Sequence, residues 1–387
     1  MDEAQRSSSY DRISVEKGSL GAERLADLCN KVPGYIHCDL EDSEGDADIY
    51  YVYGWLLIYE GFGKRDLRWE IHYILWAEFV RIARKDPGSE IREFQNFDLI
   101  IMPILSNDLW DAPFGLNTKS NVERCLSAIS HLETRYPLWP KLAELLRAGD
   151  GLTSARDLDQ VAFTMGNARP KTVVPSPYMR LPKRGQVIKR CMSILGYYNI
   201  YHKSYIPDQA ITFGELPTPD PERAYWYMQE YAPLLRIAGS ICILLGRGQS
   251  KKPRPWRVLK RIVITPVSRP ELDEWMMGEF ICPLSFEVLR NLPTHAWTPY
   301  TLREDHSNGL TDEEIAARLR PWDDFAAETL KRFVNIEEKR MGPSFSSSLR
   351  VLALVEIGFV ENSRTNQLDL FMLQATVGHW PKASRIL

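Results

Sequence analysis

The amino-acid sequence predicts a mainly α-helical protein with two helical lobes, a basic cleft between them, and an arm at each end of the chain. Apolar residues recur at helical spacing in segments such as 67–84 and 222–246. Strand-like alternation is scarce, and its best example is 257–265, with 99–105 a weaker one. The regular succession of strands and helices that marks a parallel sheet is missing from the pattern. A helical fold is therefore expected.

Two capping boxes mark helix starts. Ser120 is followed three residues later by Glu123, and Thr311 is followed in the same way by Glu314. In such a pair the hydroxyl accepts from a backbone N–H of the first turn, and the glutamate bonds back to the cap. Pro321 suits the first position of a further helix, which we expect to continue to about residue 340.

Prolines indicate where the two lobes meet. Pro217, Pro219 and Pro221 interrupt regular structure near the middle of the chain, so a linker is predicted there. Apolar stretches at 349–360 and 368–373 have to be buried, either on the chain's own body or on a neighbouring subunit. The predicted parts are an N-terminal arm (1–25), an N-terminal helical lobe (26–207), a linker (208–222), a C-terminal helical lobe (223–341) and a C-terminal arm (342–387).

Composition indicates a folded chain in a reducing compartment. Of 387 residues, 44% are hydrophobic and 26% are charged, which is typical of globular proteins. Six cysteines are present without a CxxC pair, so reduced thiols are expected rather than disulfides or a zinc site. The N-terminus does not resemble a signal peptide, and the longest apolar run, 237–246, is about half a membrane span. A soluble protein with no membrane partner is predicted.

Positive charge is gathered in two windows, although the formal net charge is only −3. Windows 161–207 and 247–269 each contain eight lysines and arginines and no acidic residue. Such polarity fits a basic groove on an acidic body. In the second window Pro253 and Pro255 keep the chain extended beside Trp256, as suits a segment that follows a sugar–phosphate backbone. The side chains predicted to bind RNA are Arg180, Lys183, Arg184, Lys189, Arg190, Lys203, Arg247, Lys251, Lys252, Arg254, Arg257 and Lys260.

Both windows also have plain structural explanations. Residues 181–190, with Tyr197, Tyr198 and Tyr201 after them, are explained equally well as the solvated start of a helix followed by core tyrosines. The second window fits an exposed interdomain loop, or a site for an acidic protein partner. Segment 222–246 between the windows fits a buried helix of the second lobe.

Part of segment 222–246 resembles a known family. Its residues Tyr231, Pro233, Leu234, Leu235, Ala238 and Gly239 resemble a Tyr-Pro-Leu-Leu…Ala-Met-Gly stretch of the nucleoproteins of non-segmented negative-strand RNA viruses. This sequence departs from the pattern by the inserted Ala232, by Arg236-Ile237 in place of an aromatic-Ser pair, and by the missing methionine. The resemblance implies two helical lobes that clamp single-stranded RNA, and arms that reach adjacent subunits. A fungal-virus branch is one candidate within the family.

These observations together predict a viral nucleoprotein. It would encapsidate single-stranded genomic RNA by sequence-independent phosphate contacts and polymerise with itself into a helical or ring nucleocapsid. A viral polymerase or phosphoprotein is an expected partner, and the virion and host cytoplasm are the expected locations. We expect no enzymatic activity, no catalytic residue, no metal site and no cofactor, because HExxH, P-loop, GxGxxG and GxSxG patterns are absent.

Two other functions stay open at this point. One is the capsid subunit of an icosahedral double-stranded RNA virus, which would also present basic surfaces to RNA. The other is a cellular helical enzyme of unknown activity.

Overall fold

The structure is a computed structural model in which the chain divides into two compact units. The first unit comprises Met1–Pro103, Leu109–Leu142 and Gly378–Leu387, and the second comprises Ile104–Asp108 and Ala143–Val377. The residues that the structure describes are 12–16, 49–53, 98–101, 118–180, 185–191, 200–201, 212–216, 225–247, 256–267, 278–283, 312–362 and 367–376.

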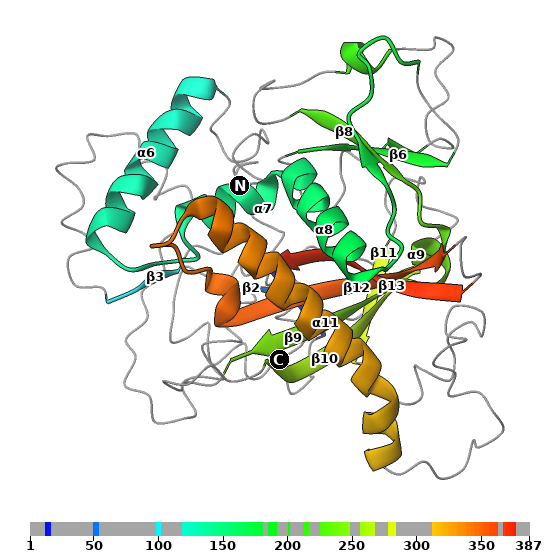
Figure 1. Cartoon of the computed structure of the whole chain (residues 1–387). Helices are drawn as coiled ribbons and strands as arrows, with labels where there is room; N and C mark the ends of the chain where they lie inside the picture. Colours follow the sequence, from blue (N-terminus) through cyan, green and yellow to red (C-terminus); the bar gives the residue numbers. More distant parts are fainter. Residues whose placement is uncertain are drawn as a thin grey trace. The chain divides into compact units, whose positions relative to one another are not determined.

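A five-stranded antiparallel sheet forms the centre of the second unit (Figure 1). Its order is β11-β10-β9-β12-β13, so the central strand β9 pairs with β10 on one side and with β12 on the other. The strands are β9 (Ser240–Gly246), β10 (Arg257–Val267), β11 (Gly278–Pro283), β12 (Leu352–Asn362) and β13 (Gln367–Thr376).

The central strand β9 explains the longest apolar run of the sequence. All seven of its residues are buried, because the strand is covered on both faces and paired on both edges. The helix predicted for 222–246 is therefore wrong in this part. A short apolar run fits a buried strand as well as a buried helix, and periodicity alone does not separate the two. The flanking Gly239, with a φ of 77°, and Gly246 bound the strand.

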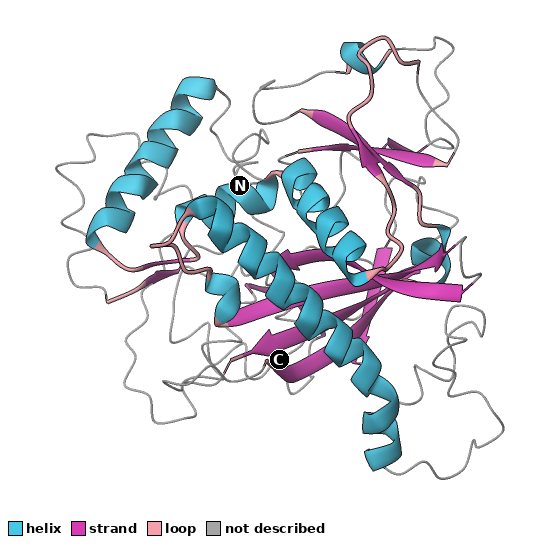
Figure 2. Cartoon of the chain, viewed as in Figure 1, coloured by secondary structure: helices cyan, strands magenta, loops and turns pink. Residues whose placement is uncertain are grey.

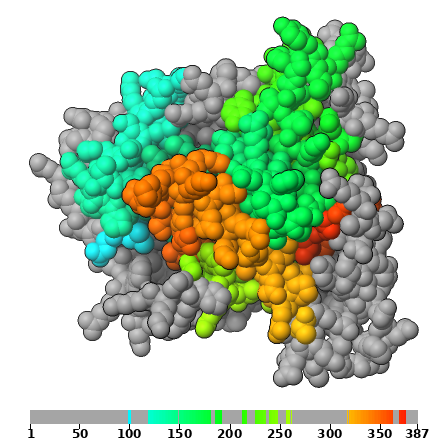
Figure 3. Space-filling view, in the orientation of Figure 1, coloured from blue at the N-terminus to red at the C-terminus, as the bar shows by residue number. Residues whose placement is uncertain are grey.

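Two helices, α8 (Gly151–Met165) and α11 (Asp312–Met341), pack on each other and on this sheet. Figure 2 shows them crossing the same face, and in Figure 3 the orange α11 lies directly against the green α8. Trp322 of α11 meets Phe359 of β12 edge-on, with 6.4 Å between ring centroids, and both side chains are almost fully buried. Pro321 lies inside α11 rather than at the start of a new helix, so the expected helix boundary there is wrong.

A smaller antiparallel sheet also belongs to the second unit. Its order is β5-β8-β6-β7. One face is covered by a core of Ile188, Leu216, Trp226 and Met228. The strands are β5 (Thr172–Val173), β6 (Gln186–Arg190), β7 (Ile200–Tyr201) and β8 (Trp226–Glu230); the short helix α9 (Pro233–Ala238) follows β8.

The described part of the first unit contains one long helix and short strands. Helix α6 spans Lys119–Arg135, and the side chain of Thr118, two residues before the predicted cap Ser120, accepts from Asn121 N at 3.3 Å. Strands β1 (Arg12–Glu16) and β2 (Ile49–Tyr53) pair antiparallel; β3 (Ile100–Ile101) and β4 (Leu138–Trp139) pair parallel. Helix α7 (Leu142–Gly149) leads into the second unit.

The prediction of a mainly α-helical fold with two helical lobes is wrong. The second unit is built on antiparallel sheets, and segments 349–360 and 368–373 supply much of strands β12 and β13 of its central sheet. Those segments were expected in a C-terminal arm because they are strongly apolar and follow a serine-rich stretch. Instead, β12 pairs with β13, and β12 also pairs with the edge of β9 that β10 does not occupy. None of the described helices is both long enough and apolar enough to cross a lipid bilayer.

Candidate functional site

The candidate site is a group of polar side chains that connects the two sheets of the second unit. We call it the inter-sheet cluster. Its members come from α8, from the segment after α8, and from strands β5, β6, β8, β9, β12 and β13. They are Asp159, Arg169, Thr172, Lys189, Gln229, Ser240, Glu356 and Gln374.

Strand alternation places Lys189 and Gln229 on the same face of the smaller sheet. Val187 pairs with Gln229 and Ile188 pairs with Met228, so Ile188 and Met228 point into the apolar core on one face. Successive side chains of a strand point to opposite faces. Lys189 and Gln229 therefore share the other face, where a polar site can form.

Lys189 is a partly buried cation held by a neutral amide. Its Nζ donates to Gln229 Oε1 at 2.8 Å, and Gln229 Nε2 donates in turn to Thr172 Oγ1 at 3.0 Å. Among the described residues, no carboxylate lies within ion-pair distance of this ammonium group. The pKa of Lys189 is lowered to about 8, mainly by burial and also by the neighbouring charge of Arg169, while the charge of Glu356 acts in the opposite direction.

Arg169 ties α8 to β13. It forms an ion pair with Asp159, and its Nη1 donates to Ala155 O at 3.1 Å. Its Nε donates to Met372 O in β13 at 3.2 Å. Burial lowers the pKa of Arg169 and raises that of Asp159, although each charge opposes the shift of the other. Because its donors are used within the protein, Arg169 contributes a fixed positive charge beside Lys189.

Glu356 supplies the negative charge of the cluster. It lies in β12 opposite Gln374 of β13, and only 7% of it is exposed. Its carboxylate accepts from Ser240 Oγ at 2.5 Å and from Gln374 Nε2 at 2.6 Å. Both carboxylate oxygens therefore take part in hydrogen bonds inside the protein.

The cluster as a whole is suited to an anion. Two cations and two carboxylates belong to it, but Arg169 is paired with Asp159, and Glu356 is held by a hydroxyl and an amide. Lys189 is the cation whose hydrogen-bond partner is neutral. An anion that reached Lys189 would relieve the desolvation of its charge. In the described part of the chain, no three His, Cys, Asp or Glu side chains are grouped as metal ligands, so a metal site is not supported by these residues.

The twelve cations predicted to bind RNA have diverse positions. Lys189 and Arg190 are neighbours in β6 and point to opposite faces, and Arg190 is buried. Arg247 lies over the ring of Trp256, with 5.6 Å between its Cζ and the ring centroid. Arg180 is exposed, and its backbone forms an isolated antiparallel β-bridge with Thr212. Arg257 is also exposed and lies in β10, as does Lys260. Lys183, Arg184, Lys203, Lys251, Lys252 and Arg254 lie outside the described residues.

Sequence reasoning missed most of the inter-sheet cluster. Glu356 is an acidic residue within a strongly apolar stretch, and Ser240 begins the apolar run of β9. A polar residue inside such a run is the available signal, since buried polar groups require partners. Which partners they have depends on strand register, which the sequence pattern does not give.

Comparisons with known proteins give no family. No family model and no curated protein matches the sequence. Among solved structures, a D-cycloserine synthetase shares 11% identity over 78% of this chain and 84% of its own, with a TM-score of 0.36. A carboxyaminoimidazole ribonucleotide synthase from Aspergillus clavatus, complexed with ATP, shares 8% identity over 84% and 68%, with a TM-score of 0.39. A D-alanyl-alanine synthetase A from Vibrio cholerae shares 10% identity over 72% and 67%, with a TM-score of 0.27.

The predicted viral nucleoprotein is wrong, and so are the RNA-binding and nucleocapsid roles attached to it. The fold consists of antiparallel sheets with helices on them, where the prediction needed two helical lobes around a basic cleft. The three solved structures compared above share at most 11% identity with this chain, at TM-scores of 0.39 or below. Their TM-scores are too low for the likeness to establish an activity.

Proposed function

We propose that this chain is an enzyme that binds the phosphate groups of a nucleotide at Lys189 in the inter-sheet cluster. The observation that carries the proposal is the environment of Lys189, a desolvated ammonium group whose hydrogen-bond partner is a neutral amide. The ammonium group of lysine, a compact positive charge on a flexible side chain, is a common phosphate ligand in proteins. None of the described neighbours of Lys189 brings a negative charge into contact with its ammonium group. A bound phosphate would supply that charge.

Gln229 would position the lysine for this role. Gln229 is only 9% exposed, and its amide accepts from Lys189 while donating to Thr172. An amide held at both ends keeps its partner in one orientation without neutralising the charge. The positive charge of Arg169 adds to the attraction, because Arg169 is fixed to α8 and β13 and does not need to move.

The pKa of Lys189 favours an enzyme over a passive binding protein. Lysines whose pKa is brought toward neutrality by burial and by a neighbouring cation are concentrated at active sites. Burial lowers the pKa of Lys189 to about 8, so both the charged and the neutral amine are accessible near neutral pH. Such a group can bind an anion and can also exchange a proton.

Adenine nucleotides are the first ligands to test. The carboxyaminoimidazole ribonucleotide synthase compared above is named as a complex with ATP, which makes adenine nucleotides practical probes. It is the environment of Lys189, and not that likeness, that indicates a phosphate ligand.

Isothermal titration of the whole chain with ADP and with ATP tests the proposal. We compare wild-type protein with Lys189→Met, which keeps the length of the stem and removes the charge. Losing one charged contact to phosphate weakens binding by about tenfold or more, since about 1.4 kcal/mol corresponds to tenfold in Kd. Lys331→Met is the matched control, because Lys331 is an exposed lysine of α11 outside the cluster.

Two results would contradict the proposal. Folded wild-type protein that binds neither nucleotide at millimolar concentration would remove the phosphate site. Equal affinities of the wild type and Lys189→Met would show that nucleotide binds without Lys189.

A further inference from the structure

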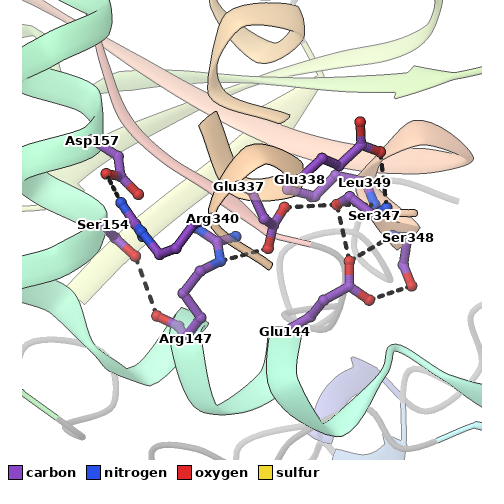
Figure 4. A network of polar contacts seen from close by, with 10 residues as sticks. All are labelled: Glu144, Arg147, Ser154, Asp157, Glu337, Glu338, Arg340, Ser347, Ser348 and Leu349. Atoms are coloured by element: carbon purple, nitrogen blue, oxygen red, sulfur yellow. Dashed lines mark hydrogen bonds and ion pairs between the residues drawn. The ribbon is translucent and has the colours of Figure 1, made fainter. Parts of the chain in front are cut away.

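A second group of buried polar residues joins three elements of the second unit. Glu144 comes from α7, Glu337 from α11, and Ser347 from the turn between α11 and β12. We call these three residues the Ser347 bridge. Figure 4 shows both carboxylates directed at the same serine hydroxyl. Their exposed fractions are 4%, 1% and 2%, so the bridge lies inside the protein.

One hydroxyl oxygen contacts both carboxyl groups. Ser347 Oγ is 2.9 Å from Glu144 Oε1 and 2.7 Å from Glu337 Oε2. Both distances are those of hydrogen bonds. Each short contact between two oxygens needs a hydrogen atom between them, because otherwise lone pairs face each other.

The number of hydrogen atoms decides the protonation of the pair. A serine hydroxyl has one hydrogen to donate and two lone pairs with which to accept. If Glu144 and Glu337 were both ionised, Ser347 could donate to one of them, and the contact with the other would have no hydrogen. A proton on one carboxyl group supplies the missing hydrogen. The backbone N–H of Leu349 donates to Ser347 Oγ at 3.3 Å and takes the second lone pair.

The surrounding contacts are compatible with one remaining negative charge. Ser348 N donates to Glu144 Oε1 at 2.5 Å, and Arg147 Nε lies 2.5 Å from Glu337 Oε1. The Arg147 guanidinium also lies over the ring of Phe333, with 4.7 Å from Cζ to the ring centroid. The Ser348 N–H donor and the positive charge of Arg147 stabilise a carboxylate, whereas burial and the mutual repulsion of two carboxylates disfavour a second one.

Other charged groups near the bridge are ion-paired, and Glu338 Oε1 also accepts from Ser347 N of the bridge at 3.1 Å. Glu338 of α11 is paired with Arg350 of the turn, and Arg340 of α11 is paired with Asp157 of α8. Among the described residues, the titratable and charged groups that face the bridge are Glu144 and Arg147 from α7, Asp157 from α8, Glu337, Glu338 and Arg340 from α11, and Arg350 from the turn.

We propose that Glu144 and Glu337 share one proton through Ser347, and that this proton holds the turn before β12 in place. The carboxyl pair then carries a single negative charge in the folded protein. When the proton is removed, two buried carboxylates face one hydroxyl group that can donate to only one of them. The turn of residues 347–350, which carries this hydroxyl, can then separate from the carboxylates. Strand β12, which carries Glu356, begins two residues after this turn.

The pKa of Glu337 agrees with this assignment. Burial raises it above the ordinary value of 4.5, and the charge of Glu144 raises it further, while Arg147 and Ser347 lower it. The folded protein therefore keeps a proton that the unfolded chain has released. The stability from this proton is fully present below about pH 4.5, and it is lost as the pH rises through the higher folded pKa.

Chemical denaturation as a function of pH tests the shared proton. Glu337→Gln places an uncharged NH2 donor where the carboxyl group was, so it mimics the protonated state at every pH. Relative to this variant, the wild type is expected to become less stable above pH 4.5, by up to about tenfold in the unfolding equilibrium constant per pH unit. A constant difference between the two proteins across pH 4.5–8 would overturn the proposal.

Glu338→Gln is a matched control on the neighbouring residue. Its hydrogen bond with Arg350 lowers the pKa of Glu338, so the folded state favours the ionised form. Relative to this variant, the wild type should gain stability as the pH rises toward 4.5, which is the opposite direction. The same direction in both comparisons would overturn the proposal, because it would reflect a general effect of removing a glutamate.

Infrared spectroscopy gives a second measurement that does not depend on unfolding. A protonated carboxyl group has a C=O absorption distinct from that of a carboxylate, and near pH 6 ordinary glutamates are ionised. The wild type is expected to show this absorption, and Glu337→Gln and Glu144→Gln are each expected to lose it. An unchanged absorption in whichever variant folds would place the proton elsewhere. None of these measurements involves a nucleotide, so they test the shared proton independently of the proposed function.

Discussion

Raising the pH from 7 to 9 is expected to weaken nucleotide binding by about tenfold. Burial lowers the pKa of Lys189 to about 8, so roughly nine in ten molecules carry the ammonium charge at pH 7 and one in ten at pH 9. Phosphate is attracted to the charged form. Loss of that form lowers the apparent affinity in proportion, which corresponds to about 1.4 kcal/mol. The phosphates of ADP are already ionised at pH 7, so the ligand adds no opposing change.

The stability of the free protein is expected to change in the opposite direction. The ordinary pKa of lysine is 10.5, and the folded protein lowers it to about 8. Below pH 8 both states hold the proton and the folded state bears the full penalty of a desolvated charge. Between pH 8 and 10.5 the folded state has lost a proton that the unfolded chain keeps, so stability rises. The gain is at most about 3 kcal/mol, and less where water screens the partly exposed side chain.

A competition titration with a fluorescent ADP analogue at pH 7, 8 and 9 measures the pH dependence of nucleotide binding. Wild type and Lys331→Met should weaken together, and Lys189→Met should bind weakly without this pH dependence. Urea denaturation at the same pH values measures the free energy of unfolding. In Lys189→Met this free energy should not rise above pH 8. The reasoning is refuted if the Kd of the wild type is constant from pH 7 to 9, or if Lys189→Met retains the same slope.

Three further outcomes follow from the core of the second unit. Phe359→Ala should destabilise the protein by about 3–5 kcal/mol in urea denaturation, because Phe359 is fully buried against Trp322; a loss below about 1 kcal/mol would contradict that packing. Gly358→Ala should cost about 1–3 kcal/mol, because the added Cβ would lie 2.6 Å from Leu235 Cδ2, and an unchanged melting temperature would show that the neighbours give way. Cys191 should resist alkylation in the native protein at pH 8, because burial raises the pKa of its thiol to about 12; mass spectrometry showing rapid native labelling would contradict this.

The sequence was most informative where a local signal decides the structure. The strand predicted for 257–265 is confirmed by β10, in which positions 262–265 are all β-branched residues. The capping-box pattern of the sequence, Thr311 with Glu314, lies where α11 begins at Asp312; Thr311 itself is outside the described residues. By contrast, the apolar run in β9 and the apolar stretches in β12 and β13 have no clear period. Burial on both faces removes the polar positions that would have marked them as strands.

The candidate site was largely beyond sequence reasoning. Lys189 was selected as one of twelve cations, on the expectation of RNA, and not for its amide partner. Gln229, Ser240 and Glu356 were not selected at all. They belong to separate strands and come together through antiparallel pairing, as when Glu356 meets Gln374 across β12 and β13. Pairing over long sequence distances is set by register, and a one-residue shift would turn each side chain to the other face.

The position of β9 has a consequence for how the chain is made. On the ribosome this strand emerges well before β12, its neighbour on one side; Ser240 and Glu356 are 116 positions apart. Until then a fully apolar strand has one unpaired edge, and such edges recruit other nascent chains. A premature stop between the two strands should therefore yield aggregates rather than a smaller folded fragment.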